Sequence, residues 1–179
     1  PASTNPKVTQ IGNYIFRACF TDNLQGRSMA EFAVQEMGAR TAIVITNTEN
    51  AYSVDLARFF IDRFQKSGRV LQELDYLQNT NDFTPILHTV KQTQPDVVFI
   101  PGYHRDAAYI LKQAYQMGIS TVFLGGDGWD DIMYDYSPSG LDGHFFAEHW
   151  HIDIPDERSR QFVSEYSRTH DKYRTGLVA

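Results

Sequence analysis

Three polar loops carry residue types that could bind a small molecule. Each loop follows a short apolar run, and the loops are 47–53 (NTENAYS), 101–104 (PGYH) and 125–129 (GGDGW). Tyr52 and Tyr103 offer rigid apolar rings with polar tips, while Asp127 offers a carboxylate that can form a charge-assisted bond with a cation. Backbone amides at the helix start near Ser53 can hold an anion. A ligand with an ammonium and a carboxylate fits this set, and an α-amino acid is the simplest such molecule.

Apolar runs alternate with amphipathic stretches, and this alternation predicts the elements that position the loops. The runs 42–46 (AIVIT) and 96–100 (DVVFI) are short and apolar, as in strands buried on both faces. The expected strands are 15–20, 42–46, 70–76, 96–100, 121–124 and 143–150. The expected helices are 24–37, one capped by Ser53 and ended by Gly68, one begun by Thr84-Pro85 and running to Thr93, 105–117, a short one near Asp130, and 156–173.

Strands separated by helices at this spacing predict an α/β fold. We expect a three-layer α/β/α doubly wound parallel sheet, built by residues 1–179 as a single lobe. In open sheets of this kind, ligands bind outside the carboxyl ends of the strands. The three polar loops should therefore lie along one edge of the sheet.

Each candidate residue also has a purely structural interpretation. Tyr103 could be a core tyrosine, Asp127 a turn former between glycines, and Tyr52 a packing residue at a helix start. Their shared place at one sheet edge favours a binding site over three unrelated structural roles.

Composition excludes several classes of function. The 179 residues are 42% hydrophobic and 21% charged, as in an ordinary globular domain. The net charge of −6, with no basic stripe, argues against a nucleic-acid partner. No apolar run approaches the roughly 18 residues of a membrane span, so we expect no membrane insertion. Cys19 is the only cysteine and lies in an apolar stretch, which predicts a buried small side chain and no internal disulfide.

Other clusters of histidine, acidic and glycine residues do not favour a metal, nucleotide or catalytic site. His149 and His151 would point the same way on a strand near Glu148 and His144, but a solvated strand end explains them better than a metal site. The acidic loop around Asp127 lacks the alternating ligands of a calcium loop, and the glycines beside it fail the GxGxxG spacing. There is no Walker lysine and no GxSxG motif. We expect no cofactor, no catalytic residues and no enzyme.

A series of short motifs also carries a family resemblance. The motifs are 1–6 (PASTNP), 13–17 (NYIFR), Gln25-Gly26, the Tyr52 loop, 81–84 (NDFT), 101–103 (PGY) and 125–129 (GGDGW). Taken in order, from residue 1 to about residue 170, they resemble the second lobe of the periplasmic branched-chain amino acid (Leu/Ile/Val) binding proteins. That family has the type I periplasmic binding fold, a two-lobed clamshell that closes on an amino acid and delivers it to an ABC importer.

The resemblance implies a role for each of five residues. Ala2 and Thr4 match groups that hold the ligand carboxylate and amine from the first lobe's side. Tyr52 matches an aromatic of the ligand's polar cage, Tyr103 the tyrosine that closes over the ligand, and Asp127 the acid that pairs with the α-ammonium. At Asp127 the family can have glutamate, so the identity of the bound side chain stays open.

The resemblance also sets expectations about the parent protein. The first lobe would precede Pro1 and further crossings would follow Ala179, so the chain would be a truncated lobe whose partner lobe is missing. Its partners would be an amino acid and an ABC permease, and its location periplasmic or extracellular, with a lipid anchor possible. Two alternatives remain: an amino-acid- or amide-sensing regulatory or receptor domain of the same fold, and an enzyme of flavodoxin-like shape.

Overall fold

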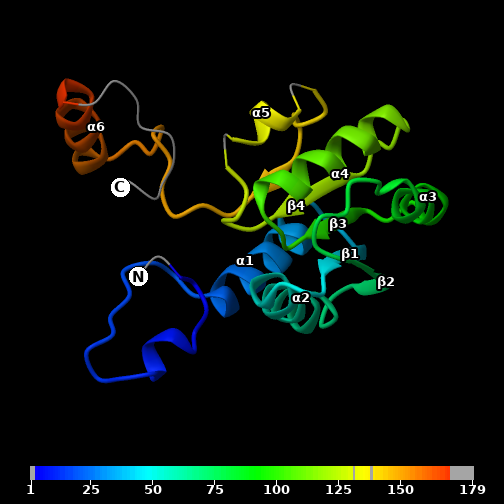
Figure 1. The fold of residues 1–179 in the computed structure, drawn as a ribbon, viewed down its shortest axis with the longest axis horizontal. Coiled ribbons are helices and arrows are strands. Elements are labelled where there is room, and N and C mark those ends of the chain that lie inside the picture. Colours follow the sequence, from blue (N-terminus) through cyan, green and yellow to red (C-terminus); the bar gives the residue numbers. More distant parts are fainter. Residues whose placement is uncertain (1–2, 131, 138, 170–179) are drawn as a thin grey trace.

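A five-stranded parallel sheet forms the centre of the molecule (Figure 1). The computed structural model describes residues 3–130, 132–137 and 139–169. The strands are β1 (Thr41–Asn47), β2 (Arg69–Tyr76), β3 (Val97–Ile100), β4 (Val122–Gly125) and β5 (Phe145–Phe146). They lie in the order β2-β1-β3-β4-β5, and each neighbouring pair is parallel.

Helices cover both faces of this sheet. The helices are η1 (Val8–Gln10), α1 (Asp22–Gln35), α2 (Ala51–Phe64), α3 (Thr84–Thr93), α4 (His104–Gln116), α5 (Met133–Tyr136) and α6 (Glu157–Thr169). Side chains of α1 and α2 form one apolar cluster with the sheet, and those of α3, α4 and α5 form another. The expected three-layer, doubly wound α/β fold is therefore confirmed.

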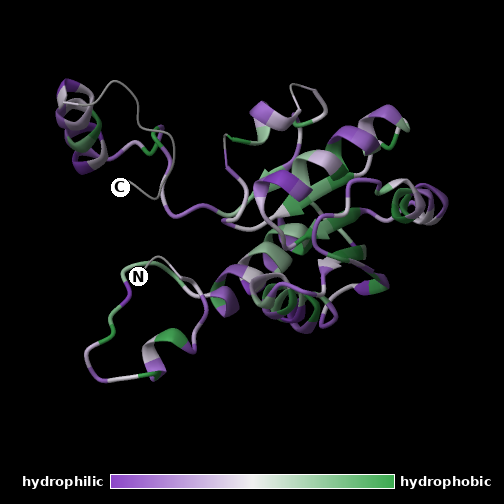
Figure 2. Cartoon of the chain, viewed as in Figure 1, coloured by the Kyte–Doolittle hydropathy of each residue, from purple (hydrophilic) through white to green (hydrophobic). Residues whose placement is uncertain are grey.

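Alternation along the central strands explains the two apolar clusters. In β1, Ala42 and Val44 pack toward α1 and α2, whereas Ile43 and Ile45 pack toward α3 and α4. Successive side chains of a strand point to opposite faces, so a central strand with helices on both faces must be apolar throughout. Figure 2 shows the resulting concentration of hydrophobic residues in the strands and in the helix surfaces that face them.

The strand order creates a crevice between β1 and β3. After β1 the chain crosses to β2 on one side, and after β2 it returns past β1 to β3 on the other side. The loops that leave β1 and β3 therefore diverge at the carboxyl edge of the sheet. Such a switch point is where open α/β sheets bind ligands.

Two expected strands were wrong in whole or in part. Residues 15–20 form no strand; Phe16 is 73% exposed, and Tyr14, just before this segment, is 92% exposed. No described strand lies beside this segment to pair with it, and a strand needs a hydrogen-bonded neighbour. The strand expected over 143–150 shrinks to Phe145–Phe146, because only these two residues pair with β4.

Helix starts differ from expectation in a systematic way. Asn50, and not Ser53, caps α2: its side chain accepts hydrogen bonds from the backbone amides of Tyr52 and Ser53. Ser53 is buried inside the helix, where its hydroxyl accepts from the Asn47 amide at 2.9 Å. Thr84 is the first residue of α3 and not its cap, and α1 begins two residues before the expected start. The last helix is seen to Thr169, and the rest of its expected span lies outside the described residues.

Cys19 is half-buried, contrary to the expected core position. Its thiol lies 3.6 Å from the Ser3 carbonyl oxygen and donates to it. The apolar run that suggested burial belongs to the segment before α1, which extends away from the sheet (Figure 1). In the part of the chain that the structure describes, no helix has the length and apolar character needed to cross a membrane.

Candidate ligand-binding site

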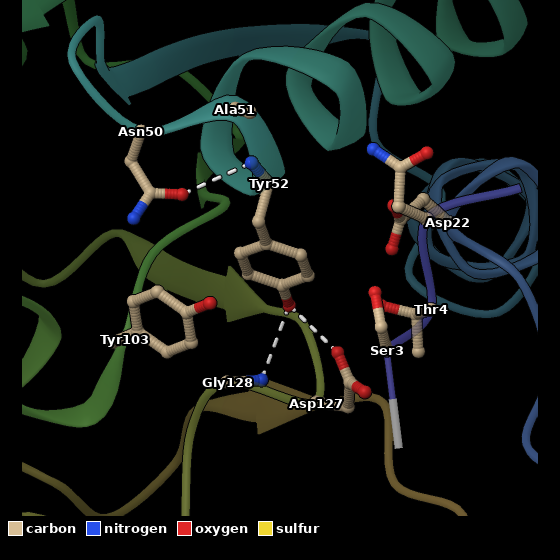
Figure 3. A pocket seen from close by; sticks show the side chains of 10 residues that line it. Ser3, Thr4, Asp22, Asn50, Ala51, Tyr52, Tyr103, Asp127 and Gly128 are labelled. Atoms are coloured by element: carbon tan, nitrogen blue, oxygen red, sulfur yellow. Dashed lines mark hydrogen bonds between the residues drawn. The ribbon is translucent and has the colours of Figure 1, made fainter. Parts of the chain in front are cut away.

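A concave site lies at the switch point predicted by the strand order (Figure 3). Its volume is about 460 Å³, within the range of small-molecule pockets. Its walls come from the segment before α1, from the start of α1, and from the loops after β1, β3 and β4. The lining residues are Ser3, Thr4, Asn5, Asp22, Asn50, Ala51, Tyr52, Tyr103, Asp127 and Gly128.

Tyr52 and Asp127 are joined at the floor of this site. The Tyr52 hydroxyl donates to Oδ1 of Asp127 at 2.8 Å and accepts from the backbone amide of Gly128 at 3.1 Å (Figure 3). Burial, followed by the negative charge of Asp127, raises the pKa of Tyr52 well above its usual value. Tyr52 therefore stays protonated and serves as a fixed hydrogen-bond donor that orients the Asp127 carboxylate.

Tyr103 forms the aromatic wall of the site. Its ring stacks on that of Tyr52, with centroids 5.2 Å apart and planes 26° apart. Its side chain is 49% exposed, so it is no core tyrosine. Burial of part of the ring, with the charges of Asp127 and Asp22, raises the pKa of its phenol. A ring that is anchored on one face and open on the other can cover an apolar ligand group.

Asp22 is a site residue that the sequence analysis missed. Its side chain is fully buried, and neither carboxylate oxygen has a hydrogen-bond partner in the described structure. Burial is the main cause that raises its pKa; the nearby Thr4 hydroxyl lowers it, and the charges of Asp127 and Asp55 raise it. The Thr21-Asp22 pair before an amphipathic helix is a helix-start signal that could have placed this carboxylate.

Thr4 lies beside Asp22 because their backbones are bonded. The Asp22 amide donates to the Thr4 carbonyl at 2.9 Å, and Arg17 donates to the same carbonyl at 3.0 Å. Thr4 is itself 5% exposed. The structure thus brings four of the five predicted residues to one site: Thr4, Tyr52, Tyr103 and Asp127. The fifth, Ala2, lies outside the described residues.

The helix start near Ser53 offers less to an anion than expected. Asn50 already accepts from the amides of Tyr52 and Ser53, at 3.0 and 3.3 Å. The lining also contains two carboxylates and no lysine or arginine. This half of the site is therefore suited to a cationic group, and a ligand carboxylate needs other partners.

Glycines let the loop after β4 approach its neighbours. A Cβ at Gly126 would lie 2.5 Å from the Tyr52 hydroxyl and 2.3 Å from the Gln25 side-chain oxygen. A Cβ at Gly128 would lie 2.7 Å from the carbonyl oxygen of Gly102. The glycines beside Asp127 thus have a steric role, which the simpler interpretation of Asp127 as a turn residue does not explain.

His149 is not the solvated strand end that the sequence suggested. Its Nε2 lies 3.1 Å from Oδ2 of Asp127, and the two side chains are only 16% and 13% exposed. His151, in contrast, has a 60% exposed side chain and lies near the exposed Asp153. Among the described residues, no group of three potential ligands is placed to hold a metal ion.

Comparison with known proteins shows which family the chain belongs to. Residues 1–177 match the family model described as "Periplasmic binding protein". The chain belongs to the periplasmic binding protein family. The predicted resemblance to its branched-chain amino acid binding members, with their type I fold, is confirmed by the relatives that follow.

Two curated relatives and one solved structure illustrate the match. The Leu/Ile/Val-binding protein homolog 3 of Brucella melitensis is 29% identical over 75% of this chain, and the Leu/Ile/Val-binding protein of Citrobacter freundii is 30% identical over 72%. A crystal structure of a leucine binding protein from Thermotoga maritima superposes on 98% of the chain with a TM-score of 0.91 and 34% identity.

The match covers only part of each relative. The chain spans 37% and 35% of the two curated relatives and 51% of the solved structure. The chain therefore corresponds to one portion of each of these relatives.

Proposed function

We propose that this chain supplies one lobe of a substrate-binding protein that captures a branched-chain amino acid, or a close analogue, for an ABC importer. The observation that carries the proposal is the pair of carboxylates, Asp22 and Asp127, that line one site with two tyrosines. The similarity to Leu/Ile/Val-binding proteins supports the choice of ligand class.

The charge of the site supports a position for the ligand's ammonium on this lobe. Asp127 is held by Tyr52, and Asp22 is buried without a partner. A buried carboxylate without a partner is costly, and a cation that enters the site relieves that cost. The ammonium of an amino acid would lie between these two acids, with the Thr4 hydroxyl nearby.

A second lobe would supply the remaining contacts. The site is open, and its described lining offers no cation for a ligand carboxylate. Exposed apolar side chains lie on the segments that leave the sheet toward the same side, among them Ile11, Tyr14 and Phe16 before α1 and Ile152 before α6. Contact with a first lobe would cover these side chains and close the site. Ala2 would belong to this junction.

The proposal includes binding without turnover, in a periplasmic or extracellular location, with the ABC permease as the protein partner. Neither a nucleophile–base pair nor a metal cluster lines the described site. Whether the parent is lipid-anchored does not affect the ligand chemistry. The ligand itself is the part that experiment tests first.

The test is a thermal-shift and titration screen on the full-length protein. Leucine, isoleucine and valine are compared with 4-methyl-2-oxopentanoate, which keeps the leucine skeleton and carboxylate but lacks the ammonium. We expect the amino acids to raise the melting temperature and the keto acid to fail, because Asp22 and Asp127 would face no cation. Equal binding of the keto acid, or no shift with any amino acid, would contradict the proposal.

A substitution at Asp127 connects that test to the site. We expect Asp127→Ala to weaken amino acid binding by about 2–5 kcal/mol, because it leaves an ammonium without its partner in a closed cleft. Asp62→Ala, at an exposed acid of α2 that does not line the site, serves as the control and should bind normally. Unchanged affinity in the Asp127 variant would remove this residue from the site.

A further inference from the structure

His149 touches the carboxylate that the proposed function assigns to the ligand, although it does not line the open site. Its Nε2 lies 3.1 Å from Oδ2 of Asp127, while Tyr52 bonds the other oxygen, Oδ1, at 2.8 Å. The N–H direction of the ring is not aligned for a hydrogen bond, and Nε2 is buried with no other partner among the described residues. Both oxygens of Asp127 are therefore matched by one side chain each.

The sheet explains why His149 arrives at this place. Strand β5 runs parallel to β4 and pairs Gly125 with Phe146. The ladder continues for one more bond, in which the Ala147 amide donates to the Gly125 carbonyl at 3.3 Å. The parallel register then carries His149 alongside Asp127, beyond the end of both strands.

An aromatic contact holds the ring against Asp127. Phe20 packs on the His149 ring with centroids 3.9 Å apart and planes tilted by 43°. Phe20 precedes Asp22 by two residues, so the contact joins the segments that carry the two acids of the site. A ring packed in this way has little freedom to turn away from Asp127.

We propose that His149 is a positioning residue that orients Asp127 for the ligand's ammonium and, when protonated, competes with that ammonium for the carboxylate. The proposal rests on the proposed function. Neutral His149 leaves the negative charge of Asp127 available to the ligand, and a small rotation of its ring would let one N–H point at Oδ2, 3.1 Å away. Protonated His149 pairs with that charge itself, so the ligand's ammonium loses its partner.

Several titratable groups lie near the His149 ring and influence how binding should depend on pH. Asp127 faces the ring from the loop after β4, Tyr52 stands behind Asp127 on α2, and Asp22 acts on Asp127 from the start of α1. Glu148 is the neighbour of His149 in the chain. Because protonated His149 would pair with Asp127, amino acid affinity should be lower at acid pH than at neutral pH.

The test compares binding profiles of the full-length protein and three variants. Leucine affinity is measured by titration calorimetry from pH 7.5 to 5.5. We expect the unchanged protein to lose about tenfold in affinity for leucine at the lower pH, because protonated His149 and the ligand's ammonium compete for the Asp127 carboxylate. His149→Gln keeps a neutral N–H donor, so it should bind leucine at pH 7.5 within about threefold of the unchanged protein and lose most of this decline.

Two further variants separate positioning from general structure. His149→Leu removes the polar contact with Oδ2 and should weaken binding about tenfold at pH 7.5, because the ligand-binding carboxylate loses the group that orients it. His151→Gln alters the exposed histidine two residues away and should leave affinity and pH profile unchanged. Melting curves without ligand show whether each variant is folded, so that a loss of affinity can be assigned to the site.

The outcomes distinguish the two proposals. If leucine binds and His149→Gln shows the same pH profile as the unchanged protein, the inference about His149 is rejected and the proposed function stands. If no amino acid binds the unchanged, folded protein, the proposed function is rejected and the inference falls with it. Loss of the pH dependence in His149→Gln alone supports both.

Discussion

At the scale of single residues, the site combines one carboxylate that is buried and unpaired in the described structure with one tyrosine whose position is fixed by hydrogen bonds. The Tyr52 side chain is held by Asp127, Gly128 and the Gln25 side-chain oxygen, so its position is set before any ligand arrives. Asp22 is the opposite case, because its carboxylate is buried and has no hydrogen bond within the described residues. A binding protein can tolerate such a charge when the ligand supplies the missing partner.

Asp22 should therefore reduce stability in the absence of ligand. Burial raises its pKa in the folded state above the unfolded value, so the folded protein carries a penalty whenever Asp22 is ionised. That penalty is fully present above the folded-state pKa and decreases as the pH falls through it toward the unfolded value. We expect Asp22→Asn to raise the unfolding free energy at pH 7 by about 1–3 kcal/mol and to weaken amino acid binding.

Denaturant titration of ligand-free protein at pH 7 and pH 4 checks this expectation. The stability gain of Asp22→Asn should be larger at pH 7 than at pH 4, since protonation at low pH removes most of the same penalty. Asp62→Asn, at an exposed acid of α2 outside the site, provides the control. A variant that is less stable than the unchanged protein at pH 7 would show that Asp22 has a stabilising partner.

At the scale of elements, opposite edges of the sheet have different tasks. The carboxyl edge carries the site, and the amino edge is fastened by Asp96 just before β3. Its Oδ2 accepts from the amides of Arg40 and Thr41 and from the Thr41 hydroxyl, each at 2.8 Å. These bonds hold the start of β1 against the start of β3. They let the loops at the other edge diverge without separating the strands.

Asp96→Ala should loosen this fastening without touching the site. The bond from the Arg40 amide, followed by that from the Thr41 hydroxyl, lowers the pKa of Asp96. Its stabilising effect is thus present above the unfolded-state pKa and lost as the pH falls through the folded one. We expect the unfolding free energy at pH 7 to drop by about 1–2 kcal/mol, a modest figure because solvent screens this exposed carboxylate.

Asp96→Asn is the matched comparison, because an amide oxygen can still accept these bonds. It should retain part of the stability and make that part independent of pH. Chemical denaturation between pH 7 and pH 3 measures both effects. If Asp96→Ala were as stable as the unchanged protein at pH 7, the three bonds would be structurally incidental.

At the scale of the whole molecule, the described chain has a closed core and an open site. Buried apolar side chains fill both faces of the sheet, so the α/β body has what it needs to fold. The segment before α1 and helix α6 extend from that body on one side (Figure 1). They expose apolar side chains such as Tyr14 and Phe16, which a partner surface would cover.

We therefore expect residues 1–179 to fold alone but to bind amino acids at least about a hundredfold more weakly than the full-length protein. A ligand of this kind is normally buried on most of its surface, and one open site cannot provide that burial. Circular dichroism would establish folding, and calorimetric titration with leucine would measure affinity. Micromolar binding by residues 1–179 alone would contradict this expectation.

The exposed apolar side chains before α1 predict that residues 1–179 associate with one another in solution. Size-exclusion chromatography of residues 1–179 should show self-association, and Tyr14→Ser combined with Phe16→Ser should reduce it. A monomeric unchanged chain would indicate that these side chains do not form a strong contact surface. The substitutions lie outside the apolar clusters of the sheet, so folding should persist.

The sequence by itself determined the architecture and most of the site. Apolar runs such as 42–46 predict strands that are buried on both faces. Because such strands are parallel, the loops that follow them lie together at the carboxyl edge of the sheet. Tyr52, Tyr103 and Asp127 could be predicted because each lies in a loop that follows a recognisable strand, and Thr4 because its motif resembles the family. Local signals were weaker at helix starts, where Asn50 and Asp22 were missed.

Only the tertiary structure decided the partners of these residues. The contact of His149 with Asp127 joins positions 22 residues apart through the register of a two-residue strand, which no periodicity reveals. The Asp22 carboxylate is buried without a hydrogen-bond partner in the described part of the chain because segments distant in the sequence pack around it in the folded protein. Residues 15–20 have the composition of a strand, yet a strand exists only where a neighbour offers its backbone. Composition sets what a segment can pair with, and the assembled molecule decides whether that pairing occurs.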